Sequence, residues 1–315
     1  MGAQLVSVSL FMKRCLTGFW LLAGTLAAGA EVVPPARPFS AVQRVVIISV
    51  DGLRPDCLLL ADAPVLHGLI KGGAYTMWAR TESEAITLPA HTSMLTGVTS
   101  RKHGIEWNRD LALLAPVYPK VPTLFEMAAH AGYRTALIAG KAKFDTLNKP
   151  GTVTYASILS GARGTDAAVA AAAVDVIERH QPDLLFIHFP SVDAVGHDKG
   201  WGSPEQLAAV TALDGHIQSV LAALERAGCR ANTVVIVSAD HGGAALTHGP
   251  DDPRSRHIPW IAAGPRVRPG FDLTRVKGLQ VDTEDTCATA CWLLGLPQPG
   301  YFDGRPVTEA FELEK

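Results

Sequence analysis

The sequence predicts one large α/β domain with a mostly parallel central sheet and helices on both faces. Hydrophobic residues make up 48% and charged residues 18% of the 315 residues, which is enough apolar material for a sizeable core. Short apolar runs alternate with helical stretches, and this order is typical of parallel sheets. No linker, charge block or internal repeat divides the chain after about residue 40. We therefore expect a single domain over residues 31–315.

Residues 1–30 have the pattern of a signal peptide. Lys13 and Arg14 precede an apolar run over residues 15–27, which is too short to span a bilayer. The small residues that follow, Ala-Gly-Ala at 28–30, are those that a signal peptidase needs. We expect the mature chain to be exported, to the periplasm or out of the cell, with no stable membrane span once the signal is removed. An uncleaved anchor is the alternative.

The strand candidates are nearly continuous apolar runs, as expected for strands buried on both faces of a sheet. They lie at residues 44–50, 135–139, 184–188, 233–237 and 258–263. The helix candidates show helical stretches that end at glycine or proline. They lie at residues 123–131, 166–179, 204–226 and 284–294.

Acidic and histidine side chains follow three of these strands. They are Asp51, then Asp193 with His197, then Asp240 with His241, and His248 lies further along the last loop. Because ligands bind at the carboxyl ends of the strands in open α/β sheets, we expect these residues to meet at one rim. Carboxylate oxygen and imidazole nitrogen are zinc ligands. Three of each would make two sites about 4 Å apart that clamp an in-line phosphoryl displacement.

Each of these residues taken alone has an ordinary interpretation. An aspartate after a strand is often a helix cap or a turn residue, and a lone histidine is more often hydrogen-bonded than a ligand. The combination of several strands that end in metal-type donors favours the metal sites. We expect Gly196, between Asp193 and His197, to let a loop turn so that both side chains reach one ion.

Thr87 is the candidate nucleophile. Leu88 and Pro89 follow it and a helical run continues to Leu95, so Thr87 fits the N-cap of a short helix. The N-terminus of a helix attracts anions through its free N–H groups and its dipole. A threonine hydroxyl is a weak nucleophile unless a metal lowers its pKa. An ordinary capping threonine is the alternative.

Several ordered motifs, spread from Arg44 to about Gly304, are similar to those of one enzyme family. They are Val50-Asp51-Gly52-Leu53-Arg54-Pro55-Asp56, Thr87-Leu88-Pro89-Ala90-His91, Thr96-Gly97, His103-Gly104-Ile105, Asp193 with Gly196-His197, and Ala239-Asp240-His241-Gly242-Gly243. The sequence resembles the type I phosphodiesterase and nucleotide pyrophosphatase branch of the alkaline phosphatase superfamily. The resemblance implies an alkaline-phosphatase-like fold, two Zn²⁺ ions and a covalent phosphothreonine at Thr87.

The resemblance also implies a role for each site residue. Asp51, Asp240 and His241 would hold one zinc together with Thr87, and Asp193, His197 and His248 would hold the other. His257 is the alternative to His248 as the last ligand, and the order of the motifs favours His248. Asn108 matches the family's phosphate-binding asparagine, with a turn residue as its alternative. Sites of this kind can also hold manganese or iron.

The substrate class stays open between two interpretations. The order of the motifs suggests hydrolysis of a diester or pyrophosphate bond in a small molecule. Lys141 and Lys143 follow the strand at 135–139, and in an extended segment they would point to the same side. The pair is similar to the substrate-binding lysines of phosphonoacetate hydrolases and to the Lys-x-Arg of a monoesterase branch, and such cations favour a dianionic group. A solvated loop is the alternative.

Three other functional classes are disfavoured. The net charge of −2 gives no footprint for nucleic acid. Sulfatases of the same superfamily require an oxidisable Cys or Ser and an arginine where Thr87 and His91 stand here. A non-catalytic, metal-stabilised binding module would be expected to lack the nucleophile or a ligand.

Four cysteines remain in the mature chain, and their pairing is left open. They are Cys57, Cys229, Cys287 and Cys291. Cys287 and Cys291 are four residues apart on one face of the last predicted helix, where a disulfide would close only a short loop. We expect this pair to be small core residues.

Overall fold

The computed structural model describes Met1 and residues 37–109 and 117–313. The contacts divide the chain into units at 1–33 and 34–315, and all helices and strands given below belong to the second unit. The signal peptide predicted at residues 1–30 lies almost entirely outside the described residues, so it stays a prediction.

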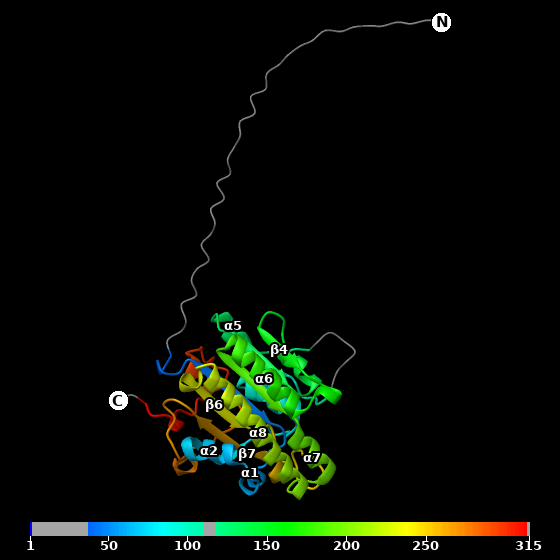
Figure 1. The fold of residues 1–315 in the computed structure, drawn as a ribbon, viewed down its shortest axis with the longest axis vertical. Coiled ribbons are helices and arrows are strands. Elements are labelled where there is room, and N and C mark those ends of the chain that lie inside the picture. Colours follow the sequence, from blue (N-terminus) through cyan, green and yellow to red (C-terminus); the bar gives the residue numbers. More distant parts are fainter. Residues whose placement is uncertain (2–36, 110–116, 314–315) are drawn as a thin grey trace. The chain divides into compact units, whose positions relative to one another are not determined.

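The centre of the second unit is an eight-stranded sheet with the order β4-β3-β5-β1-β6-β7-β2-β8 (Figure 1). The strands are β1 Arg44–Val50, β2 Ala74–Arg80, β3 Thr135–Ala139, β4 Tyr155–Ile158, β5 Leu184–Phe189, β6 Thr233–Ser238, β7 His257–Ala263 and β8 Phe271–Asp272. β1 is the middle strand and pairs in parallel with β5 and β6, with Val45 opposite Leu184 and Val234. β7 is antiparallel to both of its neighbours, β6 and β2. The prediction of a mostly parallel sheet is confirmed.

Helices form two groups, one against each face of the sheet. They are α1 Pro55–Leu60, α2 Pro64–Gly72, α3 Thr87–Thr96, α4 Ser100–His103, α5 Leu124–His130, α6 Asp166–His180, α7 Ser191–Lys199, α8 Pro204–Arg226, α9 Pro253–Arg256 and α10 Asp285–Leu294. α1, α2, α6 and α7 pack against α8, whereas α3 and α5 pack against α10. A short 3₁₀ segment, η1 at Ala142–Leu147, follows β3.

In the described part of the chain, α8 is long and apolar enough to cross a membrane by length and composition alone. Its buried residues recur every three or four positions, among them Val210, Leu213, Ile217 and Val220. This spacing is that of an amphipathic helix with one face on a core.

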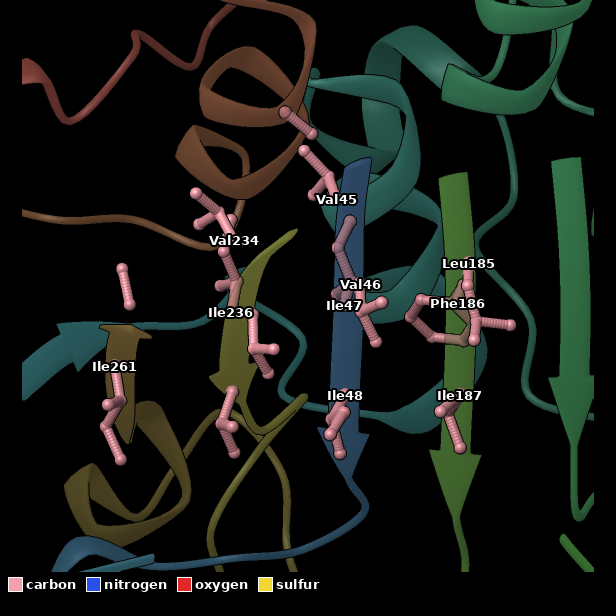
Figure 2. Close-up of a cluster of buried hydrophobic side chains, with 14 of the residues drawn as sticks. Val45, Val46, Ile47, Ile48, Leu185, Phe186, Ile187, Val234, Ile236 and Ile261 are labelled. Atoms are coloured by element: carbon pink, nitrogen blue, oxygen red, sulfur yellow. The ribbon is translucent and has the colours of Figure 1, made fainter. Parts of the chain in front are cut away.

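The core is built around β1, whose side chains from Val45 to Val50 are all buried. Figure 2 shows Ile47 and Ile48 beside Phe186 of β5 and Ile236 of β6. Burial of one such side chain contributes about 1.5–3 kcal/mol, so the three central strands form a rigid base. The residues that follow these strands are therefore held in fixed positions.

The predicted elements match β1, β3, β5, β6, β7 and α5, α6, α8, α10 to within about two residues at each end. The sequence reasoning missed β2, β4 and β8 and the helices α1, α2, α4, α7 and α9. β2 is not an apolar run: its burial alternates, and its pairing with β7 is interrupted between Thr76 and Ala79. The four cysteines are buried with free thiols, and Cys287 and Cys291 are core residues as expected.

Candidate active site

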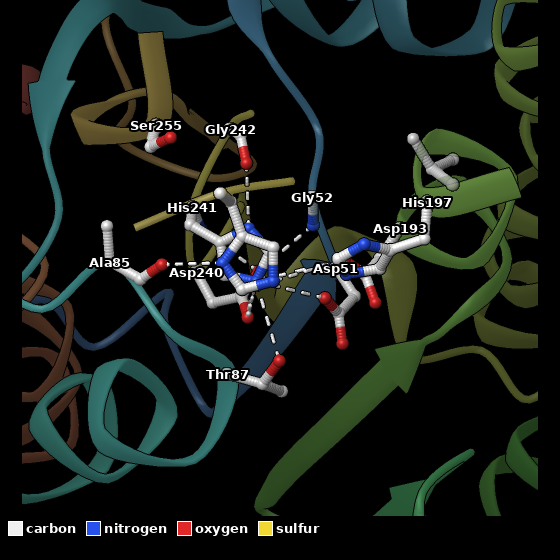
Figure 3. A network of polar contacts seen from close by, with 12 residues as sticks. Asp51, Gly52, Ala85, Thr87, Asp193, His197, Asp240, His241, Gly242 and Ser255 are labelled. Carbon is white, nitrogen blue, oxygen red and sulfur yellow. Dashed lines mark hydrogen bonds and ion pairs between the residues drawn. The ribbon is translucent and has the colours of Figure 1, made fainter. Parts of the chain in front are cut away.

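Six aspartate and histidine side chains converge at the carboxyl ends of β1, β5 and β6 (Figure 3). Asp51 follows β1, Asp193 and His197 lie on α7 after β5, and Asp240 and His241 follow β6. His248 joins them from the loop after β6. The ligand atoms form two groups in which all lie within 4.8 Å of one another: Asp193 with His197 and His248, and Asp51 with Asp193 and His241. Asp240 adjoins the second group, with its Oδ2 3.2 Å from His241 Nε2.

This grouping differs in one respect from the arrangement that the resemblance implied. The first group is the predicted set of Asp193, His197 and His248. In the second group Asp193 stands where Asp240 was expected. The reason is that Asp193 Oδ1 lies between histidines of both groups, 3.8 Å from His248 Nε2 and 3.9 Å from His241 Nε2. Asp193 therefore borders both candidate sites.

Each aspartate of the cluster presents a buried oxygen that has no hydrogen-bond partner within the described residues. These atoms are Oδ1 of Asp51, Oδ1 of Asp193 and Oδ2 of Asp240. A buried polar atom without a hydrogen bond costs about 1–3 kcal/mol, and more when it is charged. Three such atoms in one cluster fit a site that takes cations.

The three histidines are oriented as metal ligands. In each ring Nδ1 lies against a backbone carbonyl: His197 at 2.9 Å from Leu246 O, His241 at 2.8 Å from Gly242 O, and His248 at 2.8 Å from Ala85 O. Because a carbonyl only accepts hydrogen bonds, Nδ1 carries the proton and the lone pair is on Nε2, which faces the cluster. Burial lowers the pKa of His241 to about 4 and lowers that of His248, so both rings are neutral at pH 7.

Lys141 and His188 hold the other oxygens of two carboxylates. Lys141 Nζ lies 2.7 Å from Asp51 Oδ2 and 2.7 Å from Asp193 Oδ2, and His188 Nε2 lies 2.8 Å from Asp51 Oδ2. Burial acts to raise the pKa of Asp51, but Lys141 and His188 outweigh it and hold this pKa well below its usual range. Burial, Asp51 and Asp193 raise the pKa of Asp240 well above its usual value. Asp240 is thus surrounded by apolar burial and by negative charge from Asp51 and Asp193, both of which disfavour its ionised form.

Thr87 begins α3, and its hydroxyl Oγ1 lies 3.4 Å from His241 Nε2 (Figure 3). The prediction that Thr87 is the N-cap was wrong. Ile86 occupies that position, and its own side chain makes no capping hydrogen bond. Because Thr87 is the first helical residue, its side chain is not used for capping and is directed to the cluster.

Asn108 lies beside the start of α3. Its Oδ1 accepts hydrogen bonds from the Leu88 N–H at 3.0 Å and from Lys143 Nζ at 2.9 Å. Lys141 and Lys143 do not lie in an extended segment as expected, because Lys141 precedes η1 and Lys143 is part of it. The two ammonium groups consequently have different partners: Lys141 contacts the carboxylates, and Lys143 contacts Asn108.

The loop expected between Asp193 and His197 is a helix. Both residues are on α7, where a spacing of four places them on one face, and His197 Nε2 is 3.3 Å from Asp193 Oδ1. A Cβ on Gly196 would lie 2.8 Å from the indole ring of Trp201. Gly196 is therefore needed for close packing and does not make a turn.

His257, the competing ligand, belongs to neither candidate group. It is the first residue of β7, and its ring packs edge-on against Trp78 with centroids 4.9 Å apart. The structure thus brings His248 into the cluster and leaves His257 outside it.

Sequence reasoning missed two buried histidines that support the site. His188 lies in β5, and its Nδ1 accepts a hydrogen bond from the Gly140 N–H. His91 lies on α3, with Nδ1 2.8 Å from Thr87 O and Nε2 2.8 Å from Ser49 Oγ. For His188 the available signal was a polar residue within a strand that is otherwise apolar on both faces, since such a residue must find a buried partner.

The family model described as type I phosphodiesterase / nucleotide pyrophosphatase matches residues 45–254, more than half of the chain. The chain belongs to this family. An uncharacterized pyrophosphatase/phosphodiesterase of Schizosaccharomyces pombe is 25% identical over 64% of this chain and 44% of its own length. A 2,3-bisphosphoglycerate-independent phosphoglycerate mutase of Haloarcula marismortui is 28% identical over 44% of this chain and 25% of its own length. The chain thus spans less than half the length of these two relatives.

Solved structures share the fold. A murine ectonucleotide pyrophosphatase/phosphodiesterase 5, an inactive variant with a threonine replaced by alanine in complex with AMP, has a TM-score of 0.72 at 17% identity. The match covers 86% of this chain and 100% of that one. A putative sulfatase of Bacteroides thetaiotaomicron has a TM-score of 0.68 at 15% identity, over 87% of this chain and 75% of the sulfatase. The fold is alkaline-phosphatase-like.

Proposed function

We propose that this protein is an exported, two-metal phosphodiesterase or nucleotide pyrophosphatase that acts through a phosphothreonine at Thr87. One observation carries the proposal: the Thr87 hydroxyl lies beside a cluster of unpartnered carboxylate oxygens and imidazole nitrogens whose lone pairs face inward. This donor set fits zinc, and it also fits manganese or iron. Bound metal would lower the pKa of the threonine hydroxyl and stabilise charge on the phosphoryl oxygens.

The ligands divide between two ions. Asp51, Asp240, His241 and Thr87 would hold one, and Asp193, His197 and His248 the other. The shared position of Asp193 between the two groups supports two adjacent sites.

The chain's own residues account for both chemical steps. Thr87 Oγ1 loses its proton to solvent and forms a bond to phosphorus, while the bond from phosphorus to the leaving oxygen breaks. A water oxygen then forms a bond to phosphorus while the bond from phosphorus to Thr87 Oγ1 breaks; one proton of this water goes to solvent, and Thr87 Oγ1 takes a proton back from solvent. Asn108 lies at the start of α3, where its Oδ1 accepts from the Leu88 N–H, and its amide Nδ2 would donate to a non-bridging oxygen and stabilise the charge of the transition state.

The comparisons support this choice of reaction and site. The matching family is named for phosphodiester and pyrophosphate bonds. The murine structure holds AMP and lacks activity after one threonine is replaced by alanine. The predicted signal peptide, together with the "ecto" in that protein's name, supports export.

A phosphomonoesterase or phosphonate hydrolase is the second candidate. Lys143 bonded to Asn108 Oδ1 adds a positive charge next to the proposed phosphoryl position. A cation there favours a group with two negative charges over a diester with one.

The deciding experiment compares three substrates on the mature protein, with zinc and after chelation. They are p-nitrophenyl phosphate, bis-p-nitrophenyl phosphate and thymidine monophosphate p-nitrophenyl ester. We expect turnover that chelation abolishes and that is fastest on the two diesters. Preference for the monoester would move the assignment to the second candidate. Absence of hydrolysis of all three by a metal-loaded, folded protein would contradict the phosphodiesterase and the phosphomonoesterase, and a phosphonate substrate would then test the phosphonate hydrolase.

The Thr87→Ala variant tests the nucleophile. We expect it to bind two metal ions and to lose roughly 10³-fold or more of kcat, because no other hydroxyl replaces the covalent step. Thr96→Ala is the matched control, since Thr96 is a buried threonine of the same helix whose hydroxyl donates to the Thr92 carbonyl. Near-normal turnover in Thr87→Ala would remove Thr87 from the mechanism.

A further inference from the structure

Trp201 lies in the turn after α7, and its ring is packed into the middle of the candidate site. It is 7% exposed. The ring meets His197 edge-on with centroids 5.0 Å apart and meets His248 at 5.8 Å. The indole N–H donates a hydrogen bond to the Gly52 carbonyl at 2.9 Å, next to Asp51. One side chain therefore contacts the ligands of one proposed metal site and the backbone beside a ligand of the other.

The backbone of Trp201 makes a further connection, since its N–H donates to the Ala245 carbonyl at 2.9 Å. Ala245 lies on the loop between His241 and His248. Trp201 thus joins the three segments that carry the ligands: the turn after β1, helix α7 and the loop after β6.

Two glycines of the sequence motifs make space for this ring. A Cβ on Gly243 would lie 2.3 Å from the indole Cδ2 and Cε2 atoms, and its three nearest neighbours all belong to Trp201. A Cβ on Gly196 would lie 2.8 Å from the same ring and 2.8 Å from Gln206 Nε2. Gly243 does not have a positive φ, so the ring alone excludes a side chain there.

We infer that Trp201 is a positioning residue that fixes the two proposed metal sites relative to each other. This inference rests on the proposed function for the presence of the metals, but its consequences appear in metal affinity as well as in turnover. The N–H acts on the site that contains Asp51, through Gly52. The ring acts on the site that contains His197 and His248. Because outer contacts of this kind typically change metal affinity 10–100-fold, the effect is large enough to measure.

Two variants separate these contributions. Trp201→Phe keeps an aromatic ring and removes the N–H, so we expect one of the two Zn²⁺ equivalents to weaken about tenfold while the other stays near wild type. Trp201→Leu removes the ring as well, and we expect both equivalents to weaken. Zn²⁺ competition with a chromophoric chelator gives both affinities, and the unfolding temperature of the metal-free variants shows whether they fold. Trp78→Phe is the matched control, because Trp78 is 62% exposed and packs on His257 outside the cluster.

A double-mutant cycle with Gly243 gives a second, independent test. Gly243→Ala forces a methyl group into the Trp201 ring and should weaken metal binding, whereas in the Trp201→Leu background the same change should cost much less. Equal costs in the two backgrounds would overturn the inference, as would wild-type affinity for both equivalents in Trp201→Leu. Wild-type protein that binds two Zn²⁺ ions but hydrolyses no phosphoester would refute the proposed function and still leave the test of Trp201 intact.

Discussion

The two lysines of the site have different partners and therefore different tasks. Lys141 is held between Asp51 and Asp193, each at 2.7 Å, while Lys143 contacts Asn108. Burial acts to lower the pKa of Lys141, but the two carboxylates outweigh it and raise this pKa. Lys141 therefore stays charged and orders the carboxylates, whereas Lys143, beside Asn108, is the lysine that we propose to meet a substrate.

This separation predicts how Lys143 affects substrate choice. In Lys143→Met we expect kcat/KM for p-nitrophenyl phosphate to fall about tenfold, because a charge-assisted hydrogen bond contributes about 1.5–3 kcal/mol. The fall for the diester, which carries one charge less, should be smaller. Lys149→Met is the control, since Lys149 pairs with Glu126 instead. An equal fall for monoester and diester would contradict a role in distinguishing them.

Glu284, a buried carboxyl outside the site, predicts a dependence of stability on pH. Burial, with Asp282 and Glu82 nearby, raises the pKa of Glu284 to about 7, against about 4.3 in an unfolded chain. Between these values the folded chain keeps a proton that the unfolded chain has lost, so stability falls as pH rises through this window, by about 1.4 kcal/mol per unit. We expect Glu284→Gln to gain stability relative to wild type between pH 5 and pH 8 in urea unfolding. Exposed Glu225→Gln should not, and parallel wild-type and Glu284→Gln curves would contradict the prediction.

At the scale of elements, the sequence predicted the strands that carry the site better than the way the side chains enter it. The central strands were recognisable because burial on both faces requires continuous apolar runs. α7 was mistaken for a loop because glycine usually interrupts helices, and the reason for Gly196 is the distant ring of Trp201. Thr87 looked like an N-cap because a threonine before Leu-Pro usually is one, but the backbone of Ile86 already provides the extended residue. Both errors depend on tertiary contacts that local patterns do not contain.

Helix α2 illustrates a cap supplied by another element. No side chain of its own caps α2, and Asp214 of α8 accepts hydrogen bonds from the Val65 and Leu66 N–H groups at 2.9 and 2.8 Å. We expect Asp214→Ala to lower the free energy of unfolding by about 1–3 kcal/mol, and Asp214→Asn, which keeps one acceptor, by less. Urea denaturation of the metal-loaded protein measures both. Unchanged stability in Asp214→Ala, matching the exposed α8 control Thr211→Ala, would show that this cap is not needed.

At the scale of the whole molecule, the fold brings together ligands from distant parts of the chain at the end of three neighbouring strands. The sequence predicted this convergence because parallel strands β5, β1 and β6 all end at the same rim, and apolar runs that stop at Asp51, before Asp193 and at Asp240 mark that rim. It did not predict that Asp193 would border both groups, or that Lys141 would bridge two carboxylates. Those features depend on the exact spacing of strands and helices, which the apolar pattern does not record.

The same convergence predicts that metal binding stabilises the whole domain. Without metals, the buried oxygens of Asp51, Asp193 and Asp240 lack partners in the described structure. The unfolded chain cannot assemble these ligands, so the ions bind only the folded state. Free metal at 1,000 times its dissociation constant adds about 4 kcal/mol for each ion bound, or roughly 8–16 °C per ion in the unfolding temperature at about 2–4 °C per kcal/mol. We expect chelation to remove this increment from wild type and most of it from Thr87→Ala, because that variant keeps all six clustered carboxylate and imidazole side chains. The contrary outcome is an unfolding temperature that chelation does not change, in protein shown to have lost its metal. It would mean that Lys141 and the histidines already stabilise the three carboxylates, and that the ions serve turnover alone.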